Sequence, residues 1–151
     1  MNKMEKKRIL VVDDDETVLE SIARILKEEG YDVDTAENGS GAIKKSSGRF
    51  YNLALIDIRL PDMEGTKLLT AMRETTPRMI KIIITGYPSL QNAVEAVNKG
   101  ADGYIVKPVK VGELLKVAKD HLKRQEEAAD YGEEKVKGFV ETRAREKGYD
   151  V

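Results

Sequence analysis

Short apolar runs alternate with longer stretches of helical spacing along the first 123 residues. The runs lie at residues 9–12, 31–36, 53–56, 80–84 and 104–106. Between the first two runs, Leu19, Ile22, Ala23 and Leu26 mark one apolar helix face, and Gly30 follows where a helix would stop. This alternation predicts an α/β fold, in which helices cover both faces of a parallel sheet.

The runs differ in a way that predicts their places in the sheet. Residues 9–12 and 53–56 are apolar throughout, as expected of central strands that are buried on both faces. Residues 31–36 instead alternate between polar and less polar positions, with Asp32 and Asp34 on one face. We therefore predict a doubly wound, five-stranded parallel sheet in the order 2-1-3-4-5, with residues 31–36 at an edge.

Two helix starts can be assigned from their capping residues. We expect Asp62 to cap a helix from about Glu64 to Glu74. We expect Ser89 to cap a second helix, which ends before Gly100.

The composition changes after about Lys123. In residues 124–151, 14 of the 28 residues are charged, and a thin apolar stripe remains at Ala129, Val136, Phe139 and Val140. We divide the chain into an extension at 1–7, one domain at 8–123 and a helical tail or linker at 124–151. Four apolar positions are few for a coiled coil, so we expect a monomer or a weak dimer.

Composition and charge exclude several classes of protein. Cysteine is absent, which removes disulfides, zinc–thiolate sites and cysteine nucleophiles. Lys and Arg total 26 against 27 Asp and Glu, and the tail has no helix-turn-helix pattern, so we expect no direct DNA binding. The apolar run after the basic start is too short for a signal peptide or a membrane span, so we expect a cytoplasmic protein without membrane contact.

Polar residues that can bind a metal or a phosphate follow four of the five runs. They are Asp13, Asp14 and Asp15 after the first run, Asp57 after the third, Thr85 after the fourth and Lys107 after the fifth. The carboxyl ends of parallel strands lie at one edge of the sheet, and doubly wound folds bind ligands in the crevice there. The pattern therefore predicts one site from residues that are far apart in sequence.

The predicted site would concentrate negative charge. Two carboxylates about 4 Å apart repel by about 4 kcal/mol at an effective dielectric near 20. A raised pKa, a nearby lysine or a divalent cation would relieve this repulsion, and oxygen ligands favour Mg²⁺, or Mn²⁺, over zinc. A strand-end carboxylate can accept a phosphoryl group, whose oxygens Lys107 and Thr85 could bind. The lone His121 is interpreted as a surface residue.

These residues together resemble the receiver domains of response regulators in two-component, phosphorelay signalling. The motifs are Val12-Asp13-Asp14, Asp57 with Leu60-Pro61-Asp62-Met63-Glu64-Gly65, Thr85-Gly86-Tyr87, and Gly103-Tyr104 before Lys107-Pro108. The resemblance covers about Arg8 to Lys123 and implies a flavodoxin-like fold. It also implies a signalling switch, not an enzyme with an external substrate.

The resemblance also implies a role for each site residue. Asp57 would be phosphorylated by the phosphohistidine of a sensor histidine kinase or a histidine phosphotransfer protein. Mg²⁺ would be held by Asp13, Asp14, Asp57 and the backbone carbonyl of Arg59. Thr85 and Lys107 would bind the phosphoryl group, the Lys107–Pro108 bond would be cis, and Tyr104 would be the second switch residue.

Two further expectations concern the signal itself. Arg59 and Tyr87 are both large and lie two residues beyond Asp57 and Thr85, so we expect them to shield the phosphoryl group and lengthen its lifetime. The helix at 89–99 has more apolar residues than one face needs, so we expect an output partner to bind the face formed by residues 89–123.

Two alternatives remain open from the sequence. Asp13-Asp14-Asp15-Glu16-Thr17 also fits the D-x-D-x-T motif of haloacid-dehalogenase-like phosphohydrolases, with Asp13 as nucleophile. That class needs a further acidic pair after the lysine, which is missing after Lys107, and it gives Asp57 no role. A receiver that serves only as a scaffold is the second alternative, and the complete set of site residues argues against it.

Overall fold

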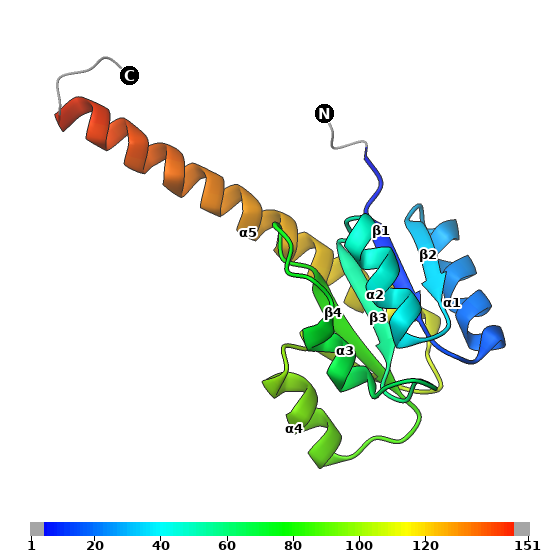
Figure 1. Ribbon diagram of the computed structural model, residues 1–151. Coiled ribbons are helices and arrows are strands. Elements are labelled where there is room, and N and C mark those ends of the chain that lie inside the picture. The colour runs from blue at the N-terminus through cyan, green and yellow to red at the C-terminus, as the bar shows by residue number, and fades with distance from the viewer. Residues whose placement is uncertain (1–4, 147–151) are drawn as a thin grey trace.

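A five-stranded parallel sheet forms the centre of the molecule. The computed structural model describes the backbone of residues 5–146 and the side chains of residues 5–131. The strands are β1 (Arg8–Val12), β2 (Asp32–Ala36), β3 (Leu53–Asp57), β4 (Ile80–Thr85) and β5 (Gly103–Val106). They pair in the order β2-β1-β3-β4-β5, which confirms the predicted order and the edge position of β2 (Figure 1).

Five helices cover the two faces of this sheet. They are α1 (Glu16–Glu28), α2 (Gly39–Gly48), α3 (Gly65–Ala71), α4 (Leu90–Asn98) and α5 (Val111–Glu146). Apolar side chains of α1 and α5 pack on one face, and those of α2, α3 and α4 pack on the other. The arrangement confirms the predicted doubly wound fold.

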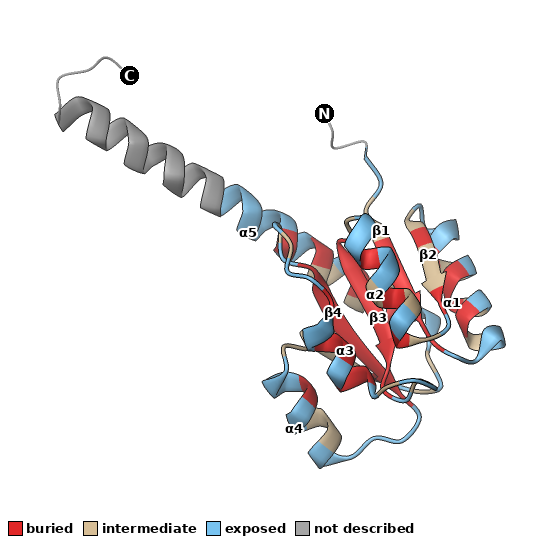
Figure 2. Cartoon of the chain, viewed as in Figure 1, coloured by how far each residue is buried: buried red, intermediate tan, exposed pale blue. Residues whose placement is uncertain are grey.

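Alternating side chains of the central strands supply both halves of the core. On β1, Ile9 and Val11 pack with the α1 and α5 layer, whereas Leu10 and Val12 pack with the opposite layer. All four side chains are buried, which explains why this run carries no polar residue (Figure 2). Because β1 is buried on both faces, its position is fixed, and so is that of the residue that follows its carboxyl end.

One of the two predicted helix caps is wrong. Ser89 does cap α4, because its Oγ accepts a hydrogen bond from the backbone N–H of Asn92 at 3.0 Å. Asp62, however, accepts bonds from the N–H groups of Gly39 and Ser40 at 2.8 and 2.9 Å, so it binds the first turn of α2, whose N-cap residue is Asn38. The α3 helix begins at Gly65 without a side-chain cap, since the N–H of Gly65 donates to the carbonyl of Ile58 at 2.7 Å.

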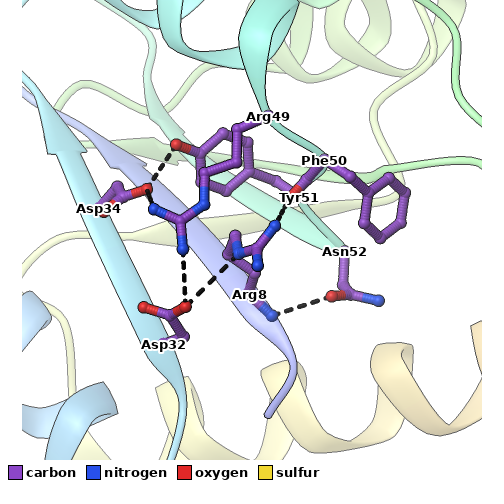
Figure 3. A network of polar contacts seen from close by, with 7 residues as sticks. All are labelled: Arg8, Asp32, Asp34, Arg49, Phe50, Tyr51 and Asn52. Atoms are coloured by element: carbon purple, nitrogen blue, oxygen red, sulfur yellow. Dashed lines mark hydrogen bonds and ion pairs between the residues drawn. The ribbon is translucent and has the colours of Figure 1, made fainter. Parts of the chain in front are cut away.

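A polar network ties the edge strand β2 to its neighbours (Figure 3). Arg49 donates to Asp32 at 2.9 Å and to Asp34 at 3.0 Å, and the buried Tyr51 donates its hydroxyl to Asp34 at 2.6 Å. Arg8 contacts Asp32 at 3.4 Å. Burial and the Asp34 carboxylate raise the pKa of the Tyr51 hydroxyl well above its usual range, so this donor keeps its proton.

A buried amide pair fixes α5 to the sheet. Gln125 accepts from the Asn52 side chain at 3.1 Å and donates to the backbone carbonyls of Asn52 and Arg78 at 2.9 and 2.8 Å. Gln125 is also the last buried residue of α5 within the described side chains, because residues 126–131 are exposed. The helix nevertheless continues to Glu146 and projects beyond the sheet (Figure 1).

None of the helices within residues 5–146 combines the length and the apolar character that crossing a membrane requires.

Candidate phosphoacceptor and metal site

Three carboxylates meet at the carboxyl ends of β1 and β3. Asp13 directly follows β1, Asp14 is the next residue, and Asp57 is the last residue of β3. One oxygen atom from each lies within 4.8 Å of the others. Asp13 and Asp57 are only 2% and 7% exposed, whereas Asp14 is open to solvent. The strand order therefore brings together residues that are 44 positions apart, as Asp13 and Asp57 are.

Lys107 reaches this cluster from the end of β5. Its Nζ lies 2.9 Å from Asp13 Oδ2 and 3.4 Å from Asp57 Oδ2. The backbone N–H of Lys107 donates to the Thr85 carbonyl at 2.7 Å, which holds the start of the β5–α5 loop beside β4. The Lys107–Pro108 peptide bond is cis, as the family resemblance implies.

The electrostatics of the site follow from this crowding. Burial raises the pKa of Asp57, the neighbouring Asp13 raises it further, and Lys107 opposes both effects. Burial alone would lower the pKa of Lys107, but its hydrogen bond to Asp13 and the charges of Asp13 and Asp57 raise it overall. The lysine thus stays charged, whereas burial and the repulsion from Asp13 destabilise the ionised form of Asp57.

The loop after Asp57 folds back tightly on the strand. The backbone N–H of Arg59 points at Asp57 Oδ1 at 3.4 Å. A Cβ atom on Gly65 would lie 2.3 Å from the Asp57 carbonyl oxygen and 2.9 Å from Ile58 Cα. Only glycine fits this close approach. The sequence shows a glycine here, but not that it faces the backbone of Asp57.

A stacked pair of large side chains comes from the two loops beside the site. The guanidinium carbon of Arg59 lies 4.4 Å from the centroid of the Tyr87 ring, in cation–π geometry. Thr85 is fully buried, and its hydroxyl accepts from the N–H of Tyr87 at 2.9 Å. The hydrogen bond fixes the loop that carries Tyr87. The stacking brings Arg59 and Tyr87 into contact, which their separate positions in the sequence do not predict.

Two other residues singled out in the sequence lie away from the carboxylates. Tyr104 stands on β5 with the α4 side of the core, and its buried hydroxyl has no hydrogen-bond partner among the described residues. His121, which we interpreted from the sequence as a surface residue, is half-buried on α5. Burial lowers the pKa of His121.

The arrangement fits a divalent cation and a phosphoryl group side by side. Three carboxylates face one ammonium group, so a cation would balance the remaining negative charge. Oxygen-only ligands suit Mg²⁺ or Mn²⁺. Lys107 Nζ, which lies beside the carboxylates, is a charged donor of the kind that binds phosphoryl oxygens. Within the described residues, this is the one group of acidic side chains close enough to share a metal.

Comparison with known proteins identifies the family. The response regulator receiver domain family matches residues 9–119 of the chain. The chain belongs to this family. Receiver domains are signalling switches of two-component systems, and the acidic pocket of Asp13, Asp14 and Asp57 fits the phosphoacceptor site of such a domain.

Curated relatives are longer than this receiver. The transcriptional regulatory protein PrrA of Mycobacterium tuberculosis is 33% identical over 150 residues, which are 95% of this chain and 64% of the relative. The regulatory protein AtoC of Escherichia coli is 34% identical over 118 residues, 78% of this chain and 26% of the relative. The chain therefore spans less than two thirds of the length of either of these curated relatives.

Solved receiver domains have the same architecture. A CheY-like response regulator receiver domain protein from Methanospirillum hungatei has a TM-score of 0.79 and 48% identity, and the match covers 82% of this chain and 99% of that one. The beryllofluoride-activated NtrC4 receiver domain dimer has a TM-score of 0.73 and 36% identity, with 78% and 98% covered.

Proposed function

We propose that this receiver is phosphorylated on Asp57 in a Mg²⁺-dependent reaction. The observation that carries the proposal is the placement of Asp57 in a buried carboxylate cluster beside Lys107. The carboxylate of Asp57 makes weaker hydrogen bonds than that of Asp13. Asp13 bonds through both oxygens, to the Asp15 N–H and to Lys107, at 2.9 Å each. Both contacts of Asp57 are longer, at 3.4 Å.

The proposed step is a displacement at phosphorus. A carboxylate oxygen of Asp57 attacks the phosphorus of a phosphohistidine, the new O–P bond forms, and the P–N bond breaks as the imidazole leaves. Lys107 and the Thr85 hydroxyl bind phosphoryl oxygens in this proposal. Asp13, Asp14, Asp57 and the Arg59 carbonyl would hold Mg²⁺, or Mn²⁺ in its place. When bound, the ion neutralises charge between the carboxylates and the incoming phosphoryl group.

The phosphodonor and the output in this proposal are both proteins. The donor would be a sensor histidine kinase or a histidine phosphotransfer protein. The output partner would bind the face of α4, β5 and the first turns of α5, where Leu90, Val94, Val97 and Val106 are exposed apolar residues. Apolar side chains gathered on one exposed face favour a protein contact.

The geometry disfavours the phosphohydrolase alternative. Asp13 would be its nucleophile, but Lys107 and a backbone N–H already occupy both oxygens of that carboxylate. The alternative also gives no function to the buried Asp57.

Phosphorylation by acetyl phosphate tests the proposal. We expect the full chain to gain one phosphoryl group by intact mass only when Mg²⁺ is present, and Asp57→Asn to abolish the gain. Asp15→Asn is the matched control, because asparagine caps a helix as well as aspartate does and the site carboxylates are unchanged. Undiminished labelling of Asp57→Asn, or labelling mapped to Asp13, would overturn the assignment.

A further inference from the structure

The turn at residues 59–64, between β3 and α3, carries one proposed Mg²⁺ ligand on its backbone, the carbonyl of Arg59. Arg59 and Glu64 form an antiparallel bridge, and the N–H of Leu60 donates to the Met63 carbonyl at 3.2 Å. The Arg59 carbonyl accepts no hydrogen bond within this turn, so it can still bind a cation. A backbone carbonyl has no side-chain torsion with which to adjust, so its position depends on where the turn lies.

Asp62, at the tip of this turn, joins it to the start of α2. Its two carboxylate oxygens accept from the N–H groups of Gly39 and Ser40 at 2.8 and 2.9 Å. Met63 adds a packing contact, because a Cβ atom on Gly39 would lie 2.6 Å from its Cγ. Within the described residues, the bonds of Asp62 are the only hydrogen bonds that join residues 59–64 to an element other than β3 and α3.

The start of α2 is in turn connected to Asp13. Ala36 ends β2 three residues before Gly39, and its carbonyl accepts from the N–H of Asp13 at 3.1 Å. Asp62 therefore joins the turn after β3 to the segment that supports the backbone of Asp13. The proposed ligands that follow β1 and those that follow β3 are thus connected beyond the ends of the paired strands.

We propose that Asp62 is a positioning residue for the Mg²⁺ site, a role that rests on the function proposed above. Asp62 holds the Arg59 carbonyl in place relative to Asp13. Mg²⁺ requires oxygens near octahedral positions at about 2.0–2.1 Å, so a small shift of a ligand that cannot adjust weakens its binding. Groups that hold metal ligands in place typically change metal affinity by about 10–100-fold when they are mutated. Asp62 bonds to the start of α2 and not to a ligand, so we expect a smaller effect.

Titration of the full chain with Mg²⁺, followed by amide NMR shifts and without a phosphodonor, tests this role. Asp62→Ala should raise the dissociation constant of Mg²⁺ about fivefold, because the turn loses both of its bonds to α2. Asp62→Asn should raise it less, since the amide oxygen can still accept one of the two hydrogen bonds.

Two control variants separate positioning from helix stability and from charge. Asn38→Ala removes the side chain that accepts from the Gly41 N–H at 2.7 Å, so it weakens the same end of α2 without altering the turn. It should lower the midpoint of urea unfolding but leave the Mg²⁺ dissociation constant unchanged. Glu64→Gln removes one negative charge from the turn, where the exposed Glu64 side chain forms no capping bond, and should change the constant by less than about twofold.

The outcomes distinguish the role of Asp62 from the site itself. If the parent shows no Mg²⁺-dependent shifts, or if Asp57→Asn binds Mg²⁺ with the parental constant, both the proposed site and the role of Asp62 are overturned. If Asp57→Asn weakens Mg²⁺ binding but Asp62→Ala does not, the site stands and only the role of Asp62 is overturned. An equal loss of affinity in Asn38→Ala or in Glu64→Gln would also refute positioning, because helix stability or charge alone would then account for the effect.

Discussion

Asp57 lies in an environment that destabilises its ionised form when no cation is bound. Its side chain is buried, Asp13 lies next to it, and Lys107 compensates only in part. Because folding raises the pKa of Asp57, the ionised form opposes folding. The stability that this group contributes is full below its unfolded pKa of 3.8 and is lost as the pH rises through the folded pKa.

Asp57→Asn should therefore raise the melting temperature of the metal-free protein at pH 7, because it removes the buried charge but keeps the shape. The gain should shrink as the pH falls and vanish below the unfolded pKa of 3.8, where the aspartate is protonated in both states. Calorimetry in EDTA across this range checks the result, with Asp15→Asn as the control. A lower melting temperature for Asp57→Asn at pH 7 would contradict the prediction.

We expect Arg59 and Tyr87 to shield the proposed phosphoryl group from hydrolytic water. Their cation–π contact at 4.4 Å holds two large side chains in one place, so each limits the movement of the other. We predict that Arg59→Asn with Tyr87→Glu shortens the lifetime of phosphorylated Asp57 about tenfold, or about 1.4 kcal/mol of barrier. Loss of phosphate at fixed Mg²⁺ concentration measures it, and an unchanged rate in the double variant would remove the shielding role.

At the scale of elements, the loop between β3 and α3 sets the position of Asp57. Gly65 is in contact with the backbone of Asp57 and Ile58, and its N–H is bonded to Ile58 at 2.7 Å. The start of α3 therefore supports the end of β3 directly. A change at this glycine acts on the strand end that carries the proposed phosphoacceptor.

Gly65→Ala should lower the free energy of unfolding by about 1–3 kcal/mol, because the added methyl meets backbone that cannot move away cheaply. It should also slow phosphorylation, since relief of the clash displaces Asp57. Gly48→Ala is the control: no atom lies within 4 Å of an added Cβ there, and alanine favours the helix. Equal unfolding midpoints in urea for Gly65→Ala and the parent would show that the loop relaxes freely.

Contacts between distant elements account for what the sequence could not predict. The strand order followed from apolar runs and one alternating edge strand, because burial on both faces leaves a clear pattern. The cap at Asp62 was misassigned because its partners, Gly39 and Ser40, lie more than 20 positions earlier. The stacking of Arg59 on Tyr87 likewise depends on how two loops meet, which no local spacing encodes.

At the scale of the whole molecule, β4 and β5 connect the proposed site to the exposed face of α4. Thr85 ends β4 at the site, and Tyr104 on β5 packs with the α4 layer, where its buried hydroxyl lacks a partner among the described residues. A movement of Thr85 toward a phosphoryl group would open space next to these elements.

Activation by beryllofluoride should therefore shift amide resonances in α4, β5 and the first turns of α5 as well as at the site. NMR of the full chain with Mg²⁺ measures this, and the same chain with fluoride but no beryllium is the control. Shifts confined to α1 and the site would contradict the prediction that activation changes the conformation of β5 and α4 around Tyr104.

The anchoring of α5 at Gln125 gives the projecting helix a defined angular phase. Each residue of an α-helix turns the chain by about 100° and advances it by about 1.5 Å. Because the amide pair with Asn52 fixes the helix at its base, the number of residues after Gln125 sets the direction of whatever the end of α5 presents. Removal of two residues would swing that direction to nearly the opposite side, whereas removal of seven would return it to within about 20°.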